Sequence, residues 1–390
     1  MMLYFRKYGD KLLFAIALAV LAGALIPFVR SGSSPEEKAS GIVVFTQWWH
    51  GELEDDVLPG LIKEFEDLHG EIEIVLDTRP YEEIWQDFFN PEALPLWGDI
   101  FALDPLWVPE LLINEIIENP SSTLLSFINV LYYNIEVLKE AGFSRPPGNR
   151  SEFLNYSRAI TNENRRSLVM DTNILRGVYD DVYPWIWSAG AGLVRDGNPT
   201  VTAGPVVDSL SFLASLNNEG LILHSDGEKL EDFILGRAAF MIAPAGKINL
   251  VRKHMGDEAF GVTFIPSPDN YAGRTFFANL EWILAVNPAS IHKEEAQLFV
   301  DFLVENAHLL SEKAGAAPSS RIQGIPDSFH SKVWEIAMAG ESAQDFIGLP
   351  WVEMDSIFRE ELDALFAQTS TTAAAAAAIQ RKWEAVLRKR

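Results

Sequence analysis

Residues 41–51 read Gly-Ile-Val-Val-Phe-Thr-Gln-Trp-Trp-His-Gly, and the chain that follows is organised around this stretch. Its apolar, β-branched first half predicts a short buried strand. The second half puts Gln47, Trp48, Trp49 and His50 at the carboxyl end of that strand, where α/β folds place their ligands. Large rings beside hydrogen-bonding groups favour a binding site, and an ordinary pair of core tryptophans is the alternative.

The length and charge of the chain narrow its class. With 390 residues, 48% of them apolar, it is long enough for two lobes or domains. Asp and Glu number 55 against 31 Lys and Arg, so the net charge of −24 argues against binding nucleic acid through phosphate contacts. Cysteine is absent, which excludes disulfides, thiolate metal sites and a cysteine nucleophile.

Eleven tryptophans are many for a chain of this size. A tryptophan offers a broad flat face and one N–H donor. The C–H face of a pyranose stacks on such rings while its hydroxyls seek polar groups. The surplus therefore favours sugar binding, with a tryptophan-rich core as the alternative.

The N-terminus has the pattern of an export signal. Arg6, Lys7 and Lys11 precede the uncharged apolar run 12–28, and Arg30 closes it. We expect cleavage after Ser31; an uncleaved membrane anchor, at the lower length limit for a spanning helix, is the alternative. In both cases the rest of the chain faces outward. The expected location is the periplasm or the outer face of the cytoplasmic membrane.

The next segments predict a parallel sheet. Apolar residues recur at helical spacing over 53–68, and 71–77 alternates as a strand does. Strand, helix and strand joined by short links form a βαβ unit. Residues 100–103 are a third strand with Asp104 at its carboxyl end, and 105–118 reads as a helix.

Further along, the chain alternates between extended and helical patterns. The tryptophan-rich segment 180–189 is predicted to be helical, and 276–286 is extended and carries Glu281 and Trp282. The six alanines at 373–378 lead into a last helix, because alanine favours helix strongly.

Tests for catalysis are negative. The sequence holds no Gly-x-Ser-x-Gly elbow, phosphate-binding glycine loop or His-Glu-x-x-His motif, and its seven histidines lack metal-ligand spacing. A glycosidase would need two carboxylates flanking the sugar, for which Asp104 and Glu281 are candidates. An extracytoplasmic glycosidase thus stays open as an alternative, but we expect no enzyme, no catalytic residue, no cofactor and no metal.

The order of motifs over residues 41–390 resembles the extracellular solute-binding proteins, family 1, of bacterial carbohydrate importers of the ATP-binding-cassette (ABC) type, the maltose-binding-protein kind. Beyond the opening strand, the stretches that carry the resemblance are Gly-Asp-Ile-Phe-Ala-Leu-Asp at 98–104, Leu-Tyr-Tyr-Asn-Ile-Glu-Val-Leu-Lys-Glu-Ala-Gly-Phe at 131–143, Gly-Arg-Ala-Ala-Phe-Met-Ile at 236–242, Asn-Pro-Ala-Ser at 287–290 and Phe-Val-Asp-Phe-Leu at 299–303.

The resemblance implies a type II periplasmic-binding-protein fold. This is an α/β fold of two lobes, each a mainly parallel sheet flanked by helices, joined by crossing strands and closing on a ligand by hinge bending. Residues 1–40 would be the signal or anchor with its linker. The first lobe would hold 41–127 and 281–317. The second would hold 128–280 and 318–390 with the C-terminal helices.

The resemblance also implies a sugar or oligosaccharide bound in the interlobe cleft and delivered to the permease of an ABC importer by a monomeric protein. Charged acceptors bind hydroxyl donors strongly and rings supply an apolar floor. The cleft would draw on Gln47, Trp48, Trp49, His50, Asp104, Tyr179, Asp180, Trp187, Glu281, Trp282 and Trp351. Replacing Trp49 by alanine is predicted to lower sugar affinity about tenfold or more with folding intact.

Two departures from the family pattern bear on the ligand. The connection between Asn119 and Leu125 is short where relatives carry a longer loop near the cleft, and Pro244-Ala-Gly246 lacks the aromatic ring that is common there. A degenerate binding protein that acts as a sensor or interaction module therefore stays open beside the importer receptor.

Overall fold

The opening strand lies inside the first of two five-stranded sheets in the computed structural model, which describes residues 41–49, 53, 56–90, 97–121, 124–277, 280–314, 328–343, 345–346 and 348–389. Strand β1 (Gly41–Gln47) pairs in parallel with β2 (Ile72–Thr78) and with β3 (Ile100–Leu103). The predicted βαβ unit is thereby confirmed.

Two further strands complete this sheet, and one of them, β13, runs opposite to the other four. β13 (Leu280–Val286) returns late in the sequence and pairs antiparallel with β3 and with β4 (Leu125–Phe127). The strand order is β2-β1-β3-β13-β4. The sheet is therefore mixed, with its parallel pairs at one edge and its returning strand near the other.

The second sheet has the order β11-β5-β10-β6-β9. β10 pairs in parallel with β6, and β6 with β9, whereas β5 is antiparallel to both β10 and β11. Its strands are β5 (Asn129–Asn134), β6 (Arg166–Met170), β9 (Ile222–His224), β10 (Ala238–Pro244) and β11 (Phe260–Thr263).

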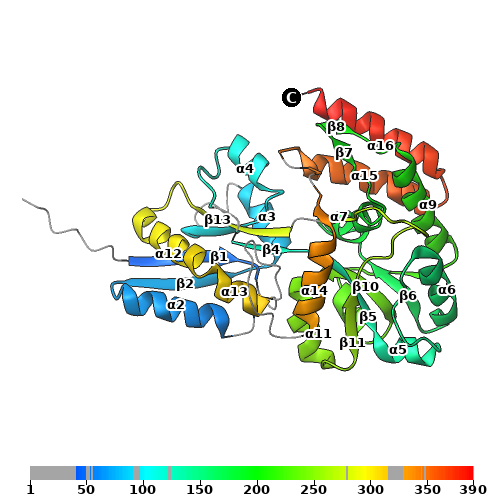
Figure 1. Cartoon of the computed structure of the whole chain (residues 1–390). Coiled ribbons are helices and arrows are strands. Elements are labelled where there is room, and N and C mark those ends of the chain that lie inside the picture. Colours follow the sequence, from blue (N-terminus) through cyan, green and yellow to red (C-terminus); the bar gives the residue numbers. More distant parts are fainter. Residues whose placement is uncertain are drawn as a thin grey trace, which may run out of the picture.

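The chain passes directly from one sheet to the other. β4 and β5 are separated by Ile128 alone, so the apolar run 125–133 supplies a strand to each sheet. The chain comes back to the first sheet after β12 (Phe276–Phe277), because the next strand is β13. β12 itself pairs in parallel with β14 (Glu341–Ser342). Figure 1 shows the resulting two α/β lobes side by side, joined by these links. The resemblance to the solute-binding proteins implies a further crossing near residues 314–318, which lies outside the described residues except for Ala314.

Helices cover both faces of the first sheet because its strands are apolar on both sides. Phe45 of β1 meets Phe299 of α12 at 6.0 Å between ring centroids. Phe101 of β3 faces the opposite way and meets Phe88 of α3 at 5.2 Å. The helices of this lobe are α2 (Val57–Leu68), α3 (Tyr81–Phe88), α4 (Val108–Ile113), α12 (Lys293–Glu305) and α13 (Ala307–Ala314).

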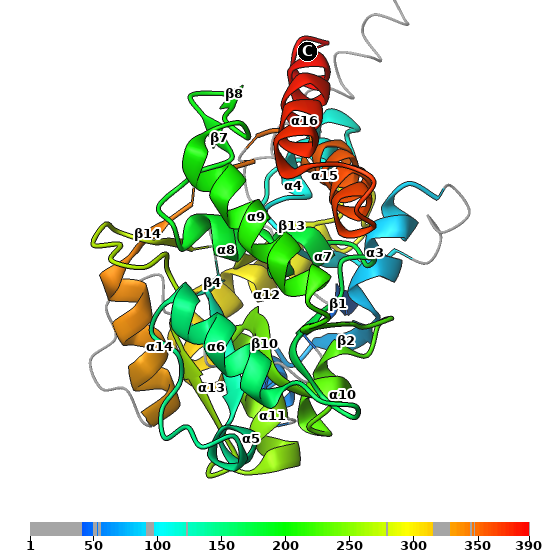
Figure 2. The same ribbon diagram turned by 90° about the vertical axis from the view of Figure 1, so that its right-hand side faces the viewer.

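The second lobe carries the remaining helices. α15 and α16 pack on each other and on α9, and Figure 2 shows all three on the side turned toward the viewer. The elements are α5 (Ile135–Glu140), α6 (Arg150–Ile160), α7 (Gly177–Asp181), α8 (Tyr183–Trp187), the ribbon β7 (Val194–Arg195) and β8 (Asn198–Pro199), α9 (Gly204–Asn218), α10 (Lys229–Ile234), η2 (Ala245–Lys247), α11 (Ile248–Met255), α14 (Ser328–Ala339), α15 (Trp351–Phe366) and α16 (Thr372–Leu387).

Two predicted helices are shorter than the sequence suggests. The segment 105–118 holds only α4, because the chain leaves the helix at Asn114 and Glu115 takes a left-handed φ of 56°. The segment 180–189 overlaps two short helices, α7 and α8, which meet at Val182. Pro184 accounts for the break, since a proline has no N–H to continue a helix.

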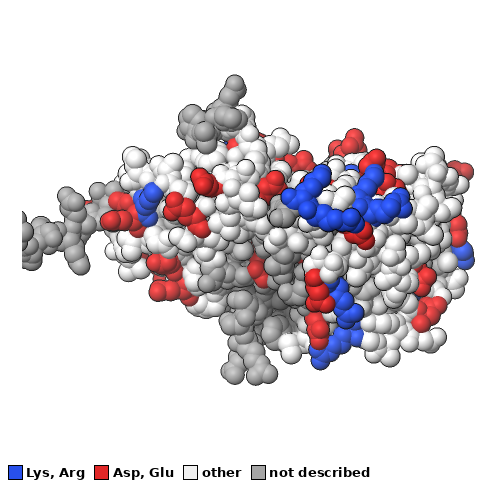
Figure 3. All heavy atoms as spheres, turned by 90° about the horizontal axis from the view of Figure 1, so that it is seen from above, with Lys and Arg blue, Asp and Glu red and all other residues white. Residues whose placement is uncertain are grey.

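None of the helices in the described part of the chain is long and apolar enough to cross a membrane. The predicted signal or anchor, 12–28, lies outside the described residues. Figure 3 shows acidic side chains dispersed over the face seen from above, with basic side chains gathered over the lobe that carries α15 and α16.

Candidate functional site

A cavity of about 570 Å³ lies between the two lobes. The first lobe lines it with residues that follow β1, β2 and β3 and with the start of β13. The second lobe lines it with the loop after β6, the start of α10 and the end of β10. The ends of neighbouring parallel strands meet at one edge of each sheet, which explains why these segments converge.

Aromatic rings form the first-lobe wall. Trp48 lies edge-on to Tyr81, with 5.2 Å between ring centroids. Trp282 is stacked on Trp49 at 4.1 Å with 8° between the ring planes, and it contacts Phe127 at 4.9 Å. Trp48 and Trp282 line the cavity, whereas Trp49 lies behind them. The wall is therefore rigid, because each ring that lines the cavity is backed by another.

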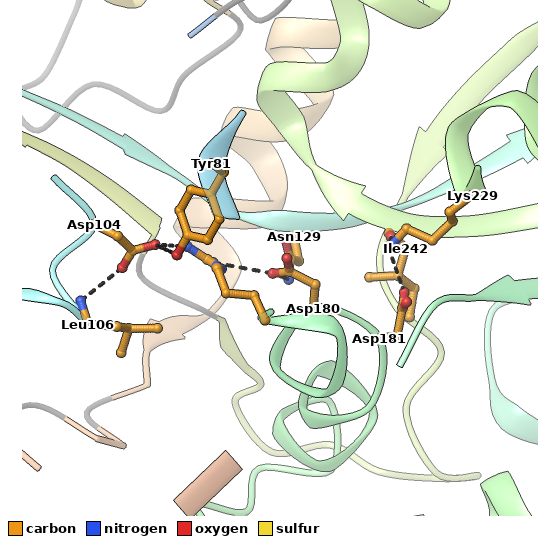
Figure 4. A network of polar contacts seen from close by, with 9 residues as sticks. Tyr81, Asp104, Leu106, Asn129, Asp180, Asp181, Lys229 and Ile242 are labelled. Atoms are coloured by element: carbon orange, nitrogen blue, oxygen red, sulfur yellow. Dashed lines mark hydrogen bonds and ion pairs between the residues drawn. The ribbon is translucent and has the colours of Figure 1, made fainter. Parts of the chain in front are cut away.

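Asp104 lies at the end of β3 and is only 2% exposed. Its Oδ1 accepts from the Leu106 amide at 2.8 Å and its Oδ2 from the Tyr81 hydroxyl at 3.0 Å (Figure 4). Burial raises the pKa of Tyr81, so its hydroxyl stays protonated and remains a donor. The carboxylate also forms an ion pair with Arg176 of the second lobe.

Arg176 therefore bridges the cleft. Its second ion pair goes to Asp180 at 3.3 Å, and its guanidinium lies over the rings of Tyr81 at 5.8 Å and Tyr179 at 5.0 Å. Arg176 has a left-handed φ of 68° just before Gly177, at the start of α7. Burial alone would lower the pKa of Arg176, but Asp180 and the two tyrosines raise it. The side chain is a permanent cation at the centre of the cleft.

Other charges in the cavity are also paired within their own lobe. Lys229 forms an ion pair with Asp181 at 2.9 Å and donates to the Ile242 carbonyl at 3.1 Å (Figure 4). Burial raises the pKa of Asp181 to about 6, although Lys229 opposes the shift. Arg79 pairs with Asp77 at 2.9 Å in the first lobe. The cavity thus combines rings with a balanced set of charges.

Five of the eleven predicted site residues line this cavity: Trp48, Asp104, Asp180, Glu281 and Trp282. The fold brings these residues together from distant parts of the sequence. His50 lies outside the described residues.

The other five lie in the core around the cleft and do not line it. Gln47 is buried and ties the end of β1 to β2, because its Nε2 donates to Thr78 at 2.5 Å. Trp187 is fully buried and its Nε1 donates to Asp345 at 2.6 Å. Trp49, Tyr179 and Trp351 are 2%, 3% and 1% exposed, so they support the walls from behind.

Sequence reasoning missed Tyr81 and Arg176, both of which line the cavity. A signal for Tyr81 was present, since it follows the carboxyl end of β2 just as Trp48 follows β1. Arg176 follows β6 in the second lobe, but no local pattern relates it to Asp104 of the first. Among the described residues, no group of three or more carboxylates, histidines or cysteines is arranged to hold a metal ion.

Comparisons with known proteins agree with this geometry. The sequence profile of the bacterial extracellular solute-binding proteins matches residues 51–308 of the 390-residue chain. No curated protein matches in a sequence comparison.

Solved structures share the fold at low identity. The GacH receptor of Streptomyces glaucescens superposes with a TM-score of 0.75 at 16% identity, covering 90% of this chain and 99% of that chain. UgpB from Mycobacterium tuberculosis, in complex with glycerophosphocholine, gives 0.74 at 16% identity, covering 90% and 99%. The maltose/maltodextrin-binding domain MalE from Bdellovibrio bacteriovorus, bound to maltotriose, gives 0.73 at 17% identity, covering 89% and 100%.

The profile match spans more than half of the chain, and the two mixed sheets with a cavity between them agree with it. The chain belongs to the family of bacterial extracellular solute-binding proteins.

Proposed function

We propose that this protein captures a sugar or oligosaccharide in the interlobe cavity and delivers it to the permease of an ABC importer. The observation that carries the proposal is that two tryptophans, Trp48 and Trp282, line one cavity together with the carboxylates of Asp104, Asp180 and Glu281. MalE from Bdellovibrio bacteriovorus, which shares the fold, is bound to maltotriose in its structure.

The rings suit the apolar faces of a sugar. Trp282 is held flat against Trp49, so it presents one face to the cavity without losing further rotamer freedom on binding. Trp48 is held edge-on by Tyr81 and contacts Trp107 at 5.3 Å. A pyranose ring lying on either tryptophan removes apolar area from water on both partners.

The carboxylates suit the hydroxyls. Hydrogen bonds to ionised acceptors are about twice as strong as those between neutral groups. Asp180 and Glu281 line the cavity from opposite lobes. Asp104 is engaged by Arg176 and Tyr81, so in this arrangement a hydroxyl reaches it only when one of these donors moves.

Closure would occur by bending at the links between the lobes. We assign residues 41–127 and 281–317 to one lobe and residues 128–280 and 318–390 to the other, with a hinge at Ile128. Strands that cross in this way let two lobes rotate as rigid bodies around a ligand.

We further propose that the protein catalyses no reaction and works outside the cytoplasmic membrane, in the periplasm or at the outer face of that membrane. The family consists of extracellular binding proteins, which supports both points. A glycosidase would place two free carboxylates on either side of a sugar. Asp104, one of the two candidates, is instead neutralised by Arg176.

The test is a tryptophan-fluorescence titration of the full chain with monosaccharides, maltose, maltotriose and glycerophosphocholine. A saturable change with one or more sugars supports the proposal. Binding of glycerophosphocholine alone would show that the ligand is a phosphodiester and not a sugar. A parallel assay with aryl glycosides should give no turnover. Turnover abolished in Asp104→Asn would establish the glycosidase instead.

A further inference from the structure

The two walls of the cleft differ in their chemistry. The first lobe contributes aromatic rings, among them Trp48 and Trp282. The lining residues that the structure describes on the second lobe include no aromatic ring. Aliphatic side chains stand there instead, namely Ile174, Leu175 and Leu230. A sugar sandwiched between two aromatic walls is therefore not the ligand that this cavity fits best.

Two of these aliphatic side chains, Ile174 and Leu175, belong to a loop that is pinned at the cavity, and Leu230 belongs to α10. Ile174 lines the cavity with 37% of its surface exposed. Arg359 of α15 donates to the carbonyl oxygens of Asn173 at 3.2 Å and Ile174 at 3.3 Å. The Leu175 amide donates to Glu82 of the first lobe at 2.6 Å. The loop cannot turn these side chains away from the cleft without breaking these bonds.

An aliphatic wall disfavours hydroxyl groups, because a hydroxyl buried without a hydrogen bond costs free energy. The second lobe also lines the cavity with charged side chains, among them Arg176 and Lys229, but ion pairs with Asp104, Asp180 and Asp181 already engage these two cations. Ligand pockets of this kind take apolar groups on apolar walls and fix orientation with a few polar contacts. The second-lobe wall thus calls for an apolar part of the ligand.

We propose that the ligand is a glycoside with an apolar aglycone, an alkyl, aryl or acyl group. The sugar ring stacks on Trp48 and Trp282, and the aglycone lies on Ile174 and Leu230. This inference rests on the proposed sugar-binding function. The cavity of about 570 Å³ is within the size range of small-molecule sites and accommodates both parts.

The test is calorimetry of the full chain with matched series of ligands below their critical micelle concentrations. The series are the free sugar and its methyl, butyl and hexyl glycosides, made for glucose, galactose and maltose. Each CH₂ group that enters the aliphatic wall should raise affinity about fourfold, or about 0.8 kcal/mol. We expect hexyl glycosides to bind at least about tenfold tighter than methyl glycosides in the series that binds.

The outcomes separate this inference from the function on which it rests. Equal affinity for methyl and hexyl glycosides, or binding of free sugars but not of alkyl glycosides, overturns the inference and leaves the sugar receptor standing. Failure of every free sugar and every glycoside to bind overturns both.

A pair of variants locates the aglycone. Ile174→Ser should flatten the rise of affinity with chain length. Leu235→Ser is the matched control, because Leu235 is 60% exposed at the end of α10 on the same lobe and does not line the cavity. A slope that survives in Ile174→Ser, or one that Leu235→Ser flattens equally, would contradict the assignment.

Discussion

The Arg176→Met substitution removes the ion pair that spans the cleft while keeping most of the side-chain volume. Arg176 contacts Asp104 of the first lobe and Asp180 of its own lobe. A hydrogen bond to a charged group contributes about 1.5–3 kcal/mol, so loss of the bond to Asp104 should shift the ratio of closed to open molecules about 10- to 150-fold toward the open form. Opening is favoured further because it lets water reach the carboxylate of Asp104, which is 2% exposed in the present arrangement.

Small-angle X-ray scattering of the ligand-free protein measures this shift. Arg176→Met should give a larger radius of gyration than the parent protein, with near-ultraviolet circular dichroism showing that the lobes remain folded. The matched control is Arg158→Met, because Arg158 forms a bidentate pair with Glu219 within the second lobe, with both bonds at 2.7 Å. Identical scattering of the parent and Arg176→Met would refute the view that this bridge holds the cleft closed.

Three further predictions concern the walls, the loop and the core. Trp48→Ala should weaken sugar binding about tenfold or more in calorimetry. The sequence alone predicted this effect for Trp49→Ala, but Trp49 is buried and does not line the cavity, so Trp49→Ala should instead lower the free energy of unfolding by about 3–5 kcal/mol in urea titrations; the reverse pattern would exchange their roles. Gly177→Ala should weaken binding, because a Cβ at this position would lie 2.2 Å from the backbone oxygen of Asp171. Gly204→Ala is the control and should leave binding unchanged, because a Cβ there meets open space. Equal affinities of the two variants would count against the pinned loop. Burial raises the pKa of Asp355 from 3.8 to about 6, so the folded state binds the proton of this carboxyl more tightly than the unfolded state does. The free energy of unfolding of the parent should therefore fall relative to that of Asp355→Asn as pH rises from about 4 to 6. A difference in denaturation midpoint that does not change with pH would argue against this burial.

The sheet edge where the site lies could be predicted from local patterns. The third strand was predicted at residues 100–103 and is observed there, which puts Asp104 at the cleft. The same rule applied to β2 would have found Tyr81. Strand ends are predictable because a short apolar run bounded by polar residues leaves few alternatives to a buried strand.

Which tryptophans face the cleft could not be predicted in the same way. Trp48 and Trp49 are neighbours, and adjacent side chains in an extended segment face opposite directions, so one lines the cavity and the other joins the core. Trp187 and Trp351 are also buried, although nothing in the sequence around them distinguishes them from the tryptophans that line the cavity. The composition of a chain shows how many aromatic rings it has, but not which of them the fold buries.

Contacts between the lobes are the hardest part to predict. Arg176 belongs to a loop of the second lobe, and its partner Asp104 lies 72 positions earlier in the first. The left-handed φ of Arg176 depends on the packing of Gly177 and on bonds from Arg359 to the preceding residues, none of which has a local sequence signature.

Titrating the sugar panel into the full chain decides whether this protein is a sugar receptor. We expect saturable binding of one sugar or glycoside per chain with a change in tryptophan fluorescence, weakened by Trp48→Ala and accompanied by no hydrolysis. Absence of binding across the panel in a protein shown to be folded, or turnover of a glycoside, would contradict this expectation.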